Sequence, residues 1–199
     1  MRKTTIATLV VIPLLFAGGY IYMTDPFNPD RAHLQDLSNQ FMEDIQFKDF
    51  HSSALYHHEL EQDRVDIGRA IEDLFLVDPE LLDILDYRIT RTEIDSSGRR
   101  GRVLVNTRFR PLKPEAIRDD ENDIEEADLQ LYWMYRHPDC PLGTDCDAGT
   151  CRRDDGTKPT KEVEDDDGET VERPYQCDEL REHEWFMNLD STLESRDYR

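Results

Sequence analysis

The residues after Asp30 show the three- and four-residue spacing of apolar positions that is typical of amphipathic helices. A first helix is expected to begin with Asp30 as its N-cap, a short second helix to cover Phe47–His57, and a third to begin near Asp63. Pro79 then predicts a short turn over Glu80–Asp83. The apolar faces of the first and third helices comprise Leu34, Leu37, Phe41 and Ile45, and Val65, Ile67, Ala70, Ile71, Leu74 and Phe75.

The period of the pattern changes to two in the middle of the chain. Apolar and polar residues alternate over 85–94 and again over 102–112, and Asp95–Gly98 between them has the composition of a turn, which predicts a β-hairpin. A third strand over 129–135 is apolar or aromatic on both faces, so we expect it to be central or to cover a pocket. The last strand is expected over 184–193.

About three helices followed by about four strands define an α+β fold class, with the helices packed on a curved antiparallel sheet. The chain has 199 residues, so one domain over 25–199 is expected to follow the first 24 residues. Within that domain, the segment at about 138–182 is long, polar and rich in cysteine. We therefore expect it to be an insertion between the third and fourth strands.

The first 24 residues contain an uncharged apolar stretch, Thr4–Met23. A helix of this length would be about 30 Å long, which matches the hydrocarbon core of a bilayer. Arg2 and Lys3 precede the stretch and Asp25 follows it, so the positive-inside rule keeps the N-terminus cytoplasmic. The sequence thus predicts a single-pass membrane protein whose N-terminal transmembrane helix is its contact with the membrane and whose domain lies in the periplasm or at the cell surface.

A cleaved signal peptide is the alternative, although the apolar region of such a peptide is usually only about 7–15 residues long. Ala17 and Gly19 are small, as a cleavage site requires, and cleavage after Gly19 would leave Tyr20 as the new N-terminus. Both interpretations place the domain outside the cytoplasm. A buried core helix of a cytoplasmic protein is the third alternative.

The net charge is strongly negative, at −21. A field of this sign disfavours nucleic acid and anionic lipid as partners, and it favours cations or basic proteins. Much of the acid lies in two stretches, Arg118–Asp128 and Asp154–Glu172, which have the composition of solvated loops.

All four cysteines lie in the C-terminal third, at Cys140, Cys146, Cys151 and Cys177. An even number in an exported domain predicts two disulfides, and the sequence does not choose among the three pairings. Zinc motifs usually contain closely spaced cysteine pairs, whereas the gaps here are five, four and twenty-five residues. No metal or other cofactor is expected.

The order and texture of the elements resemble the nuclear-transport-factor-2-like superfamily of cone-shaped α+β domains. The likeness is carried by a first amphipathic helix (HLQDLSNQFMEDI), a short aromatic segment with two histidines (FKDFHSSALYHHEL), and a third helix (DIGRAIEDLFL) that leads into hairpin strands. It covers roughly 30–137 and 183–196. The superfamily includes isomerases and dehydratases, binders of small ligands, and structural assembly domains, so the resemblance implies a fold and not one activity.

Relatives that bind small molecules hold them inside the cone, which makes the aromatic strand residues candidates for a ligand pocket. These candidates are Tyr87, Trp133, Tyr135 and Trp185, for which packing in the core is the competing interpretation. His51, His57 and His58 form a cluster that we expect to be the end of a helix rather than a site. Alternation does not place Asp86 or Asp128 inside the cone, and no catalytic residue is assigned.

The function expected from the sequence is that of a non-enzymatic, membrane-anchored protein of the bacterial cell envelope. Its domain would serve as an interaction or scaffold module with an envelope protein as partner. The alternatives are binding of a small apolar ligand in the cone and, behind that, an isomerase or hydro-lyase of the same fold.

Overall fold

A computed structural model of the chain describes residues 29–112, 124–141, 143–165 and 168–194. The chain divides into two units, Met1–His33 and Leu34–Arg199, and every contact given below lies within the second.

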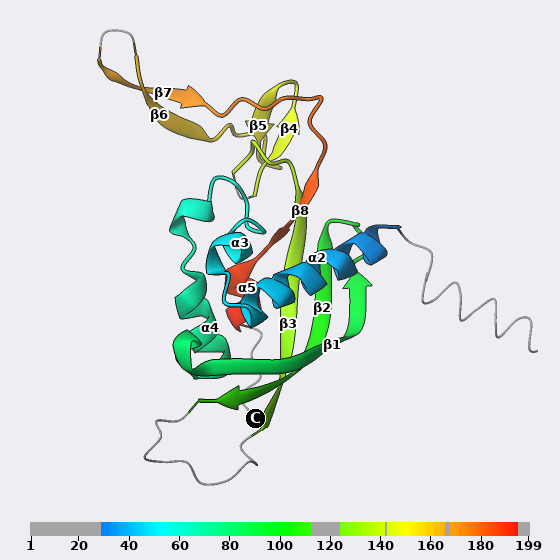
Figure 1. Cartoon of the computed structure of the whole chain (residues 1–199). Coiled ribbons are helices and arrows are strands. Elements are labelled where there is room, and N and C mark those ends of the chain that lie inside the picture. The colour runs from blue at the N-terminus through cyan, green and yellow to red at the C-terminus, as the bar shows by residue number, and fades with distance from the viewer. Residues whose placement is uncertain (1–28, 113–123, 142, 166–167, 195–199) are drawn as a thin grey trace, which may run out of the picture. The chain divides into compact units, whose positions relative to one another are not determined.

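The main sheet has four antiparallel strands in the order β1-β2-β3-β8 (Figure 1). The strands are β1 (Leu82–Ile94), β2 (Arg100–Pro111), β3 (Glu125–Arg136) and β8 (Glu184–Met187). The expected hairpin is confirmed, because Asp95 and Gly98 close the turn between β1 and β2 with a backbone hydrogen bond of 3.0 Å and Gly98 has a φ of 71°. The α+β class with a four-stranded antiparallel sheet is therefore confirmed.

Helices precede and follow the sheet in the chain. They are α2 (Pro29–Gln46), α3 (Phe50–Ala54), α4 (Ile67–Phe75) and α5 (Leu189–Glu194), with 3-10 turns η1 (Gln62–Arg64) and η2 (Pro79–Leu81). Side-chain caps set several of these starts: Asp49 accepts from the backbone N–H of Ser52, and Asp66 accepts from that of Arg69. The second helix is shorter than the sequence indicates, and the expected turn at Glu80–Asp83 is instead η2 followed at once by β1.

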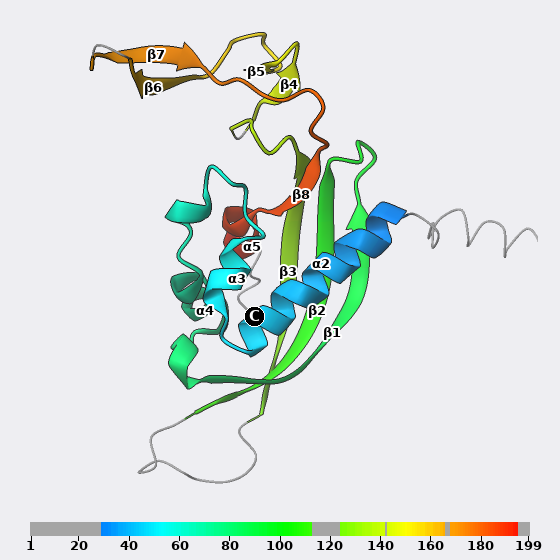
Figure 2. The same cartoon turned by 45° about the horizontal axis from the view of Figure 1, so that its top comes forward.

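The core lies between α2 and the inner face of the sheet, and α2 crosses β1–β3 in both views (Figures 1 and 2). The period-two alternation of β2 and β3 turns Val103, Val105, Leu129, Leu131 and Trp133 toward the helices. Apolar side chains of α2 and α4 complete one continuous cluster. They are Leu34, Phe41, Met42, Ile45, Ile67, Ile71, Leu74 and Phe75.

The C-terminal element differs from the strand expected over 184–193. The strand ends at Met187, because the side chain of Asn188 accepts a 3.0 Å hydrogen bond from the backbone N–H of Ser191 and so caps helix α5. The hydroxyl of Thr192 in turn accepts a 3.1 Å bond from the N–H of Tyr132, which fixes α5 against β3. A capping residue therefore outweighs the apolar alternation that continues through Leu189.

The insertion carries two short hairpins of its own. They are β4 (Asp145–Asp147) with β5 (Thr150–Arg152), and β6 (Thr160–Glu164) with β7 (Thr170–Pro174). The sequence predicts loops over Asp154–Glu172 and Arg118–Asp128, but β6 lies in the first stretch and the start of β3 in the second. Both stretches therefore contain strand residues where the sequence predicts loops, because charged side chains on an exposed strand do not prevent backbone pairing with a neighbouring strand.

The fold class predicted from the sequence is wrong in its first element. No helix within the described ranges is long and apolar enough to cross a membrane. The stretch Thr4–Met23, on which the prediction of a transmembrane helix rested, lies outside the described residues, as does the alternative cleavage site near Gly19.

Gly101 provides a test of how closely α2 packs on the sheet. A Cβ at this position would overlap the Cδ2 of Leu34 and lie 3.3 Å from the Trp185 ring. We expect Gly101→Ala to lower the free energy of unfolding by about 1–3 kcal/mol in urea denaturation, since a well-packed core resists added atoms. Gly68→Ala is the matched control, because it lies in α4 with only ordinary contacts and should be stabilising. Equal effects of the two changes would contradict close packing at Gly101.

Candidate functional site

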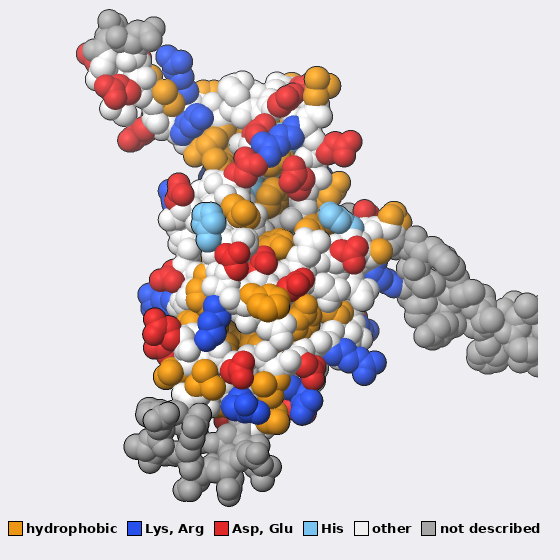
Figure 3. All heavy atoms as spheres, viewed as in Figure 1, with side chains coloured by type: hydrophobic (Ala, Val, Ile, Leu, Met, Phe, Trp, Pro, Cys, Tyr) orange, Lys and Arg blue, Asp and Glu red, His pale blue; other side chains and the backbone are white. Residues whose placement is uncertain are grey.

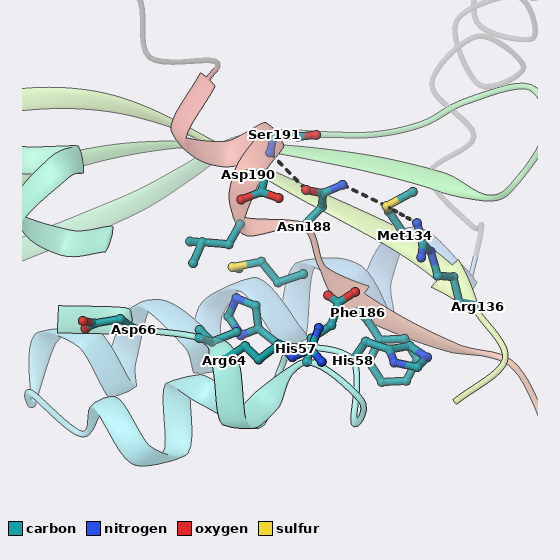
Figure 4. Close-up of a pocket in the computed structure, with 14 residues that line it drawn as sticks. His57, His58, Arg64, Asp66, Met134, Arg136, Phe186, Asn188, Asp190 and Ser191 are labelled. Carbon is teal, nitrogen blue, oxygen red and sulfur yellow. Dashed lines mark hydrogen bonds between the residues drawn. The ribbon is translucent and has the colours of Figure 1, made fainter. Parts of the chain in front are cut away.

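A pocket of about 440 Å³ lies beside β8, between the segment that follows α3 and the start of α5 (Figure 4). Its walls come from three parts of the chain that are distant in sequence, 57–66, 134–136 and 186–191. The lining residues are His57, His58, Glu61, Arg64, Val65, Asp66, Met134, Arg136, Phe186, Met187, Asn188, Leu189, Asp190 and Ser191. The volume lies within the range of small-molecule sites, and the lining is both polar and apolar.

His57 lies on the wall formed after α3 and is only 1% exposed. Its Nδ1 is 3.3 Å from the carbonyl oxygen of Ala54, so Nδ1 carries the proton and donates to that oxygen. Its Nε2 is then a hydrogen-bond acceptor, and it is buried without a partner among the described residues. Burial lowers the pKa of His57 from its ordinary value, which keeps the ring neutral at pH 7.

His58 is equally buried but has both ring nitrogens occupied. Its Nδ1 accepts from the N–H of Leu60 at 3.3 Å, so Nε2 carries the proton and donates to the carbonyl of His137 at 3.1 Å. The ring packs on Phe186 with 4.9 Å between centroids. His58 therefore holds the pocket wall to the base of the insertion, while the adjacent His57 faces the pocket.

Arg136 reaches the pocket from the end of β3, next to Met134 (Figure 4). Its Nη2 donates to the Met134 sulfur at 2.9 Å, and its Nη1 is buried without a hydrogen-bond partner among the residues that the structure describes. Burial lowers the pKa of Arg136, yet an arginine stays charged in a protein. The guanidinium is thus a partly buried cation that lacks an acceptor for one of its nitrogens.

Glu61 is the acidic group that has the largest electrostatic effect on the pKa of Arg136. Burial raises the pKa of Glu61, and the positive charge of Arg136 opposes that shift. Within the described residues the two side chains form no ion pair at 4.0 Å or closer, so Glu61 does not neutralise the guanidinium by direct contact.

The opposite wall begins where β8 becomes α5 (Figure 4). Asn188 accepts from the N–H of Ser191 and donates through Nδ2 to the Met134 sulfur at 3.0 Å. It therefore ties the start of α5 to β3. The side chain of Asp190 lies on this wall, facing His57 across the pocket (Figure 4).

The insertion is cross-linked by two disulfides, which confirms the prediction from the cysteine count. Cys140 pairs with Cys151 and Cys146 with Cys177. The sulfurs of Cys140, Cys151 and Cys177 lie within 4.8 Å of one another, so the two bridges are adjacent. The pairing joins the segment that leaves β3 to the segment that returns to β8.

Charged side chains fasten the base of the insertion to the domain. Arg181 forms ion pairs with Glu59 and, at 3.0 Å, with Asp139. The backbone N–H of Asp178 lowers the pKa of Asp139, and Arg181 adds to that effect. Burial alone would raise the pKa of Asp145, but the 2.7 Å hydrogen bond from His183 and the charge of Arg99 outweigh it, so that pKa is lowered.

A group of exposed apolar side chains forms a second candidate surface, where α2 and α4 end and β1 begins. This helix-end patch consists of Phe47, Leu76, Leu81 and Leu112, which are 74%, 72%, 44% and 41% exposed. The N–H of Leu112 donates to the carbonyl of Leu81, and Lys48, next to Phe47, donates to the carbonyl of Glu80. These bonds bring the separate segments together, and Figure 3 shows hydrophobic and charged side chains mixed at this end.

The four aromatic pocket candidates lie elsewhere. Trp133 is buried in the core, 6.3 Å from the Tyr56 ring, and Tyr87 donates from its hydroxyl to the carbonyl of Asn39. Trp185 is buried and Tyr135 is 36% exposed, with 5.2 Å between their rings. None of the four lines the pocket beside β8.

Sequence reasoning singled out His57 but missed Arg136, Glu61 and Asn188. His57 was assigned to a helix end, whereas α3 stops at Ala54 and the ring turns inward. A usable signal was Asn188 itself, since asparagine is among the preferred N-cap residues and can start a helix where the strand pattern would continue. No pattern in the sequence places Arg136 beside Glu61, because their neighbourhood depends on tertiary packing.

No protein-family model, no curated protein and no solved structure matches this chain. The likeness to the nuclear-transport-factor-2-like superfamily consequently stays a prediction from element order.

The two disulfides are expected to contribute unequally to stability. They enclose 31 and 11 residues, and the chain-entropy model assigns about 3.7 and about 2.8 kcal/mol to loops of those lengths. Replacing Cys146 and Cys177 by alanine should therefore lower the free energy of unfolding by about 1 kcal/mol more than replacing Cys140 and Cys151. Urea denaturation of the two double variants measures this difference, and the reverse order would contradict the prediction.

Acid should weaken the attachment of the insertion. The carboxyls of Asp139 and Asp145 have lowered pKa values in the folded protein, so the unfolded chain binds more protons as the pH falls. Their contribution is complete above the unfolded-state value of about 3.9 and is lost as the pH drops through the lower folded-state pKa values.

We expect the Asp139→Asn, Asp145→Asn double variant to show a shallower fall of unfolding free energy than the wild type between about pH 6 and pH 3. The exposed Asp147→Asn is the control, and it should follow the wild-type curve. Urea denaturation at each pH gives the comparison, and parallel curves for the double variant and the wild type would contradict the assignment.

Proposed function

We propose that this protein is a non-enzymatic interaction module of the cell envelope and that it works outside the cytoplasm. The two disulfides support an oxidising compartment. The closely packed core between α2 and the sheet supports a domain that acts through its surface. The observation that carries the proposal is the helix-end patch, since large apolar side chains that stay exposed together on neighbouring segments are typical of protein interaction sites.

Leu76 combines an unfavourable backbone conformation with an exposed side chain. It follows α4 with φ 54° and ψ 27°, the left-handed conformation that glycine adopts without strain and that costs other residues about 1–2 kcal/mol. Its side chain is also 72% exposed. A leucine here carries a backbone cost without the compensation of burial, so its side chain is best explained by a contact with a partner.

The charges around the patch define the partner. Glu72, Asp78 and Glu80 are exposed next to the patch, and so are the basic residues Lys48 and Arg110. With a net charge of −21, this surface favours a protein whose own apolar contact is surrounded by lysine and arginine. The same acids disfavour an anionic lipid surface.

Leu76→Gly separates binding from folding. The change removes the apolar side chain and relieves the backbone, so stability should stay unchanged or rise by up to about 1 kcal/mol, while partner binding weakens several-fold. The measurement is photo-crosslinking in the native envelope from a benzoylphenylalanine placed at Leu81, with and without Leu76→Gly, alongside urea denaturation.

Leu180→Gly is the matched control, because Leu180 is 91% exposed but lies in the insertion. It should leave the cross-linked product unchanged. Addition of salt should reduce the yield, because the complementary charges are screened. An unchanged yield in Leu76→Gly, or a product that contains two copies of this chain, would contradict the proposal.

A further inference from the structure

The pocket beside β8 holds two polar atoms that the fold leaves unsatisfied. They are Nε2 of His57 and Nη1 of Arg136, each closed to solvent and without a hydrogen-bond partner among the described residues. A buried polar atom without a partner destabilises the fold, and the cost is larger when the group is charged. Two such atoms in residues that line one pocket indicate that a ligand completes their bonding.

The two atoms require opposite groups from that ligand. His57 Nε2 is an acceptor, because Nδ1 holds the proton toward Ala54, so the ligand must offer it an O–H or N–H. Arg136 is a cationic donor, so it needs an anionic acceptor, for which a carboxylate matches the fork of the guanidinium. The two side chains enter the pocket from different walls, and Figure 4 shows them apart from each other.

Apolar side chains line the space around these polar groups. They belong to Val65, Met134, Phe186, Met187 and Leu189. Thioethers and a phenyl ring favour an aromatic body, because sulfur and ring edges both contact aromatic faces well. A volume of about 440 Å³ accommodates a molecule with one ring.

We propose that this pocket binds a small aromatic acid that carries a carboxylate for Arg136 and, at its far end, a hydroxyl or amine that donates to His57. The ligand reaches the two buried atoms when the side chains that cover them rotate, as commonly happens on binding, while the Nδ1–Ala54 bond of His57 stays in place. This site is independent of the helix-end patch, since none of the patch residues lines the pocket.

Three related probes separate the two interactions. They are 4-hydroxyphenylacetate, phenylacetate, which lacks the hydroxyl donor, and 4-hydroxyphenylacetamide, which lacks the charge. Isothermal titration calorimetry on the full chain should rank 4-hydroxyphenylacetate first. Loss of either group should weaken binding about tenfold or more, as expected for one hydrogen bond that involves a buried or charged group.

Substitutions at Arg136 and His57 show which residue is responsible for each loss of binding affinity. Arg136→Met should weaken binding of 4-hydroxyphenylacetate at least about tenfold and abolish its advantage over the uncharged amide. His57→Phe should abolish its advantage over phenylacetate while both acids still bind. Arg88→Met is the control, because Arg88 is an exposed arginine on β1 and should leave every affinity unchanged.

A second measurement does not depend on the folding of these variants. In the wild-type protein, the ¹⁵N resonance of His57 Nε2 should shift on addition of 4-hydroxyphenylacetate and not on addition of phenylacetate, with Nδ1 remaining the protonated nitrogen. Absence of binding by all three probes would overturn the proposal. Equal affinity for Arg136→Met and wild type, or an unshifted His57 resonance with bound 4-hydroxyphenylacetate, would overturn it too.

Discussion

The central position of β3 is the constraint on which the core, the pocket and the insertion all depend. Its alternation turns Leu131 and Trp133 into the core and Met134 and Arg136 to the other face, toward the pocket. The next residue, His137, begins the insertion. Its ring donates to the carbonyl of Asp178, and its own carbonyl accepts from His58. The strand β3 is apolar on both faces because one face packs in the core and the other face borders the pocket.

The short length of β8 creates the pocket. This strand pairs with β3 on one side, and on the other the N–H of Met187 donates to the carbonyl of Tyr56 at 2.8 Å. Because Asn188 then starts α5, the strand does not continue along the segment that follows α3. A longer β8 of the kind that the alternation predicts would occupy the space that now separates His57 from Asp190.

Local patterns were sufficient to predict the helices that precede the sheet, the β1–β2 hairpin and the presence, but not the pairing, of the disulfides, because each depends on neighbours in sequence or on a simple count. The pocket depends on three segments that tertiary packing alone brings together, so neither Arg136 nor Glu61 could be assigned from spacing. The end of β8 shows a different limit. Trp185, Met187 and Leu189 continue the alternation, yet one capping hydrogen bond at Asn188 contributes about 1 kcal/mol and decides between strand and helix.

The features proposed to be functional share a thermodynamic property: each makes the isolated domain less stable. Leu76 carries a left-handed backbone and an exposed side chain, and His57 and Arg136 each bury a polar atom that has no partner in the described part of the chain. The core and the two disulfides offset these costs. The fold itself does not need the residues that cause them, since glycine at position 76 and apolar groups in the pocket would be compatible with the same fold. Residues that oppose stability at a surface patch and in a pocket are best explained by binding, because a partner or a ligand supplies the contacts that the fold leaves unmade.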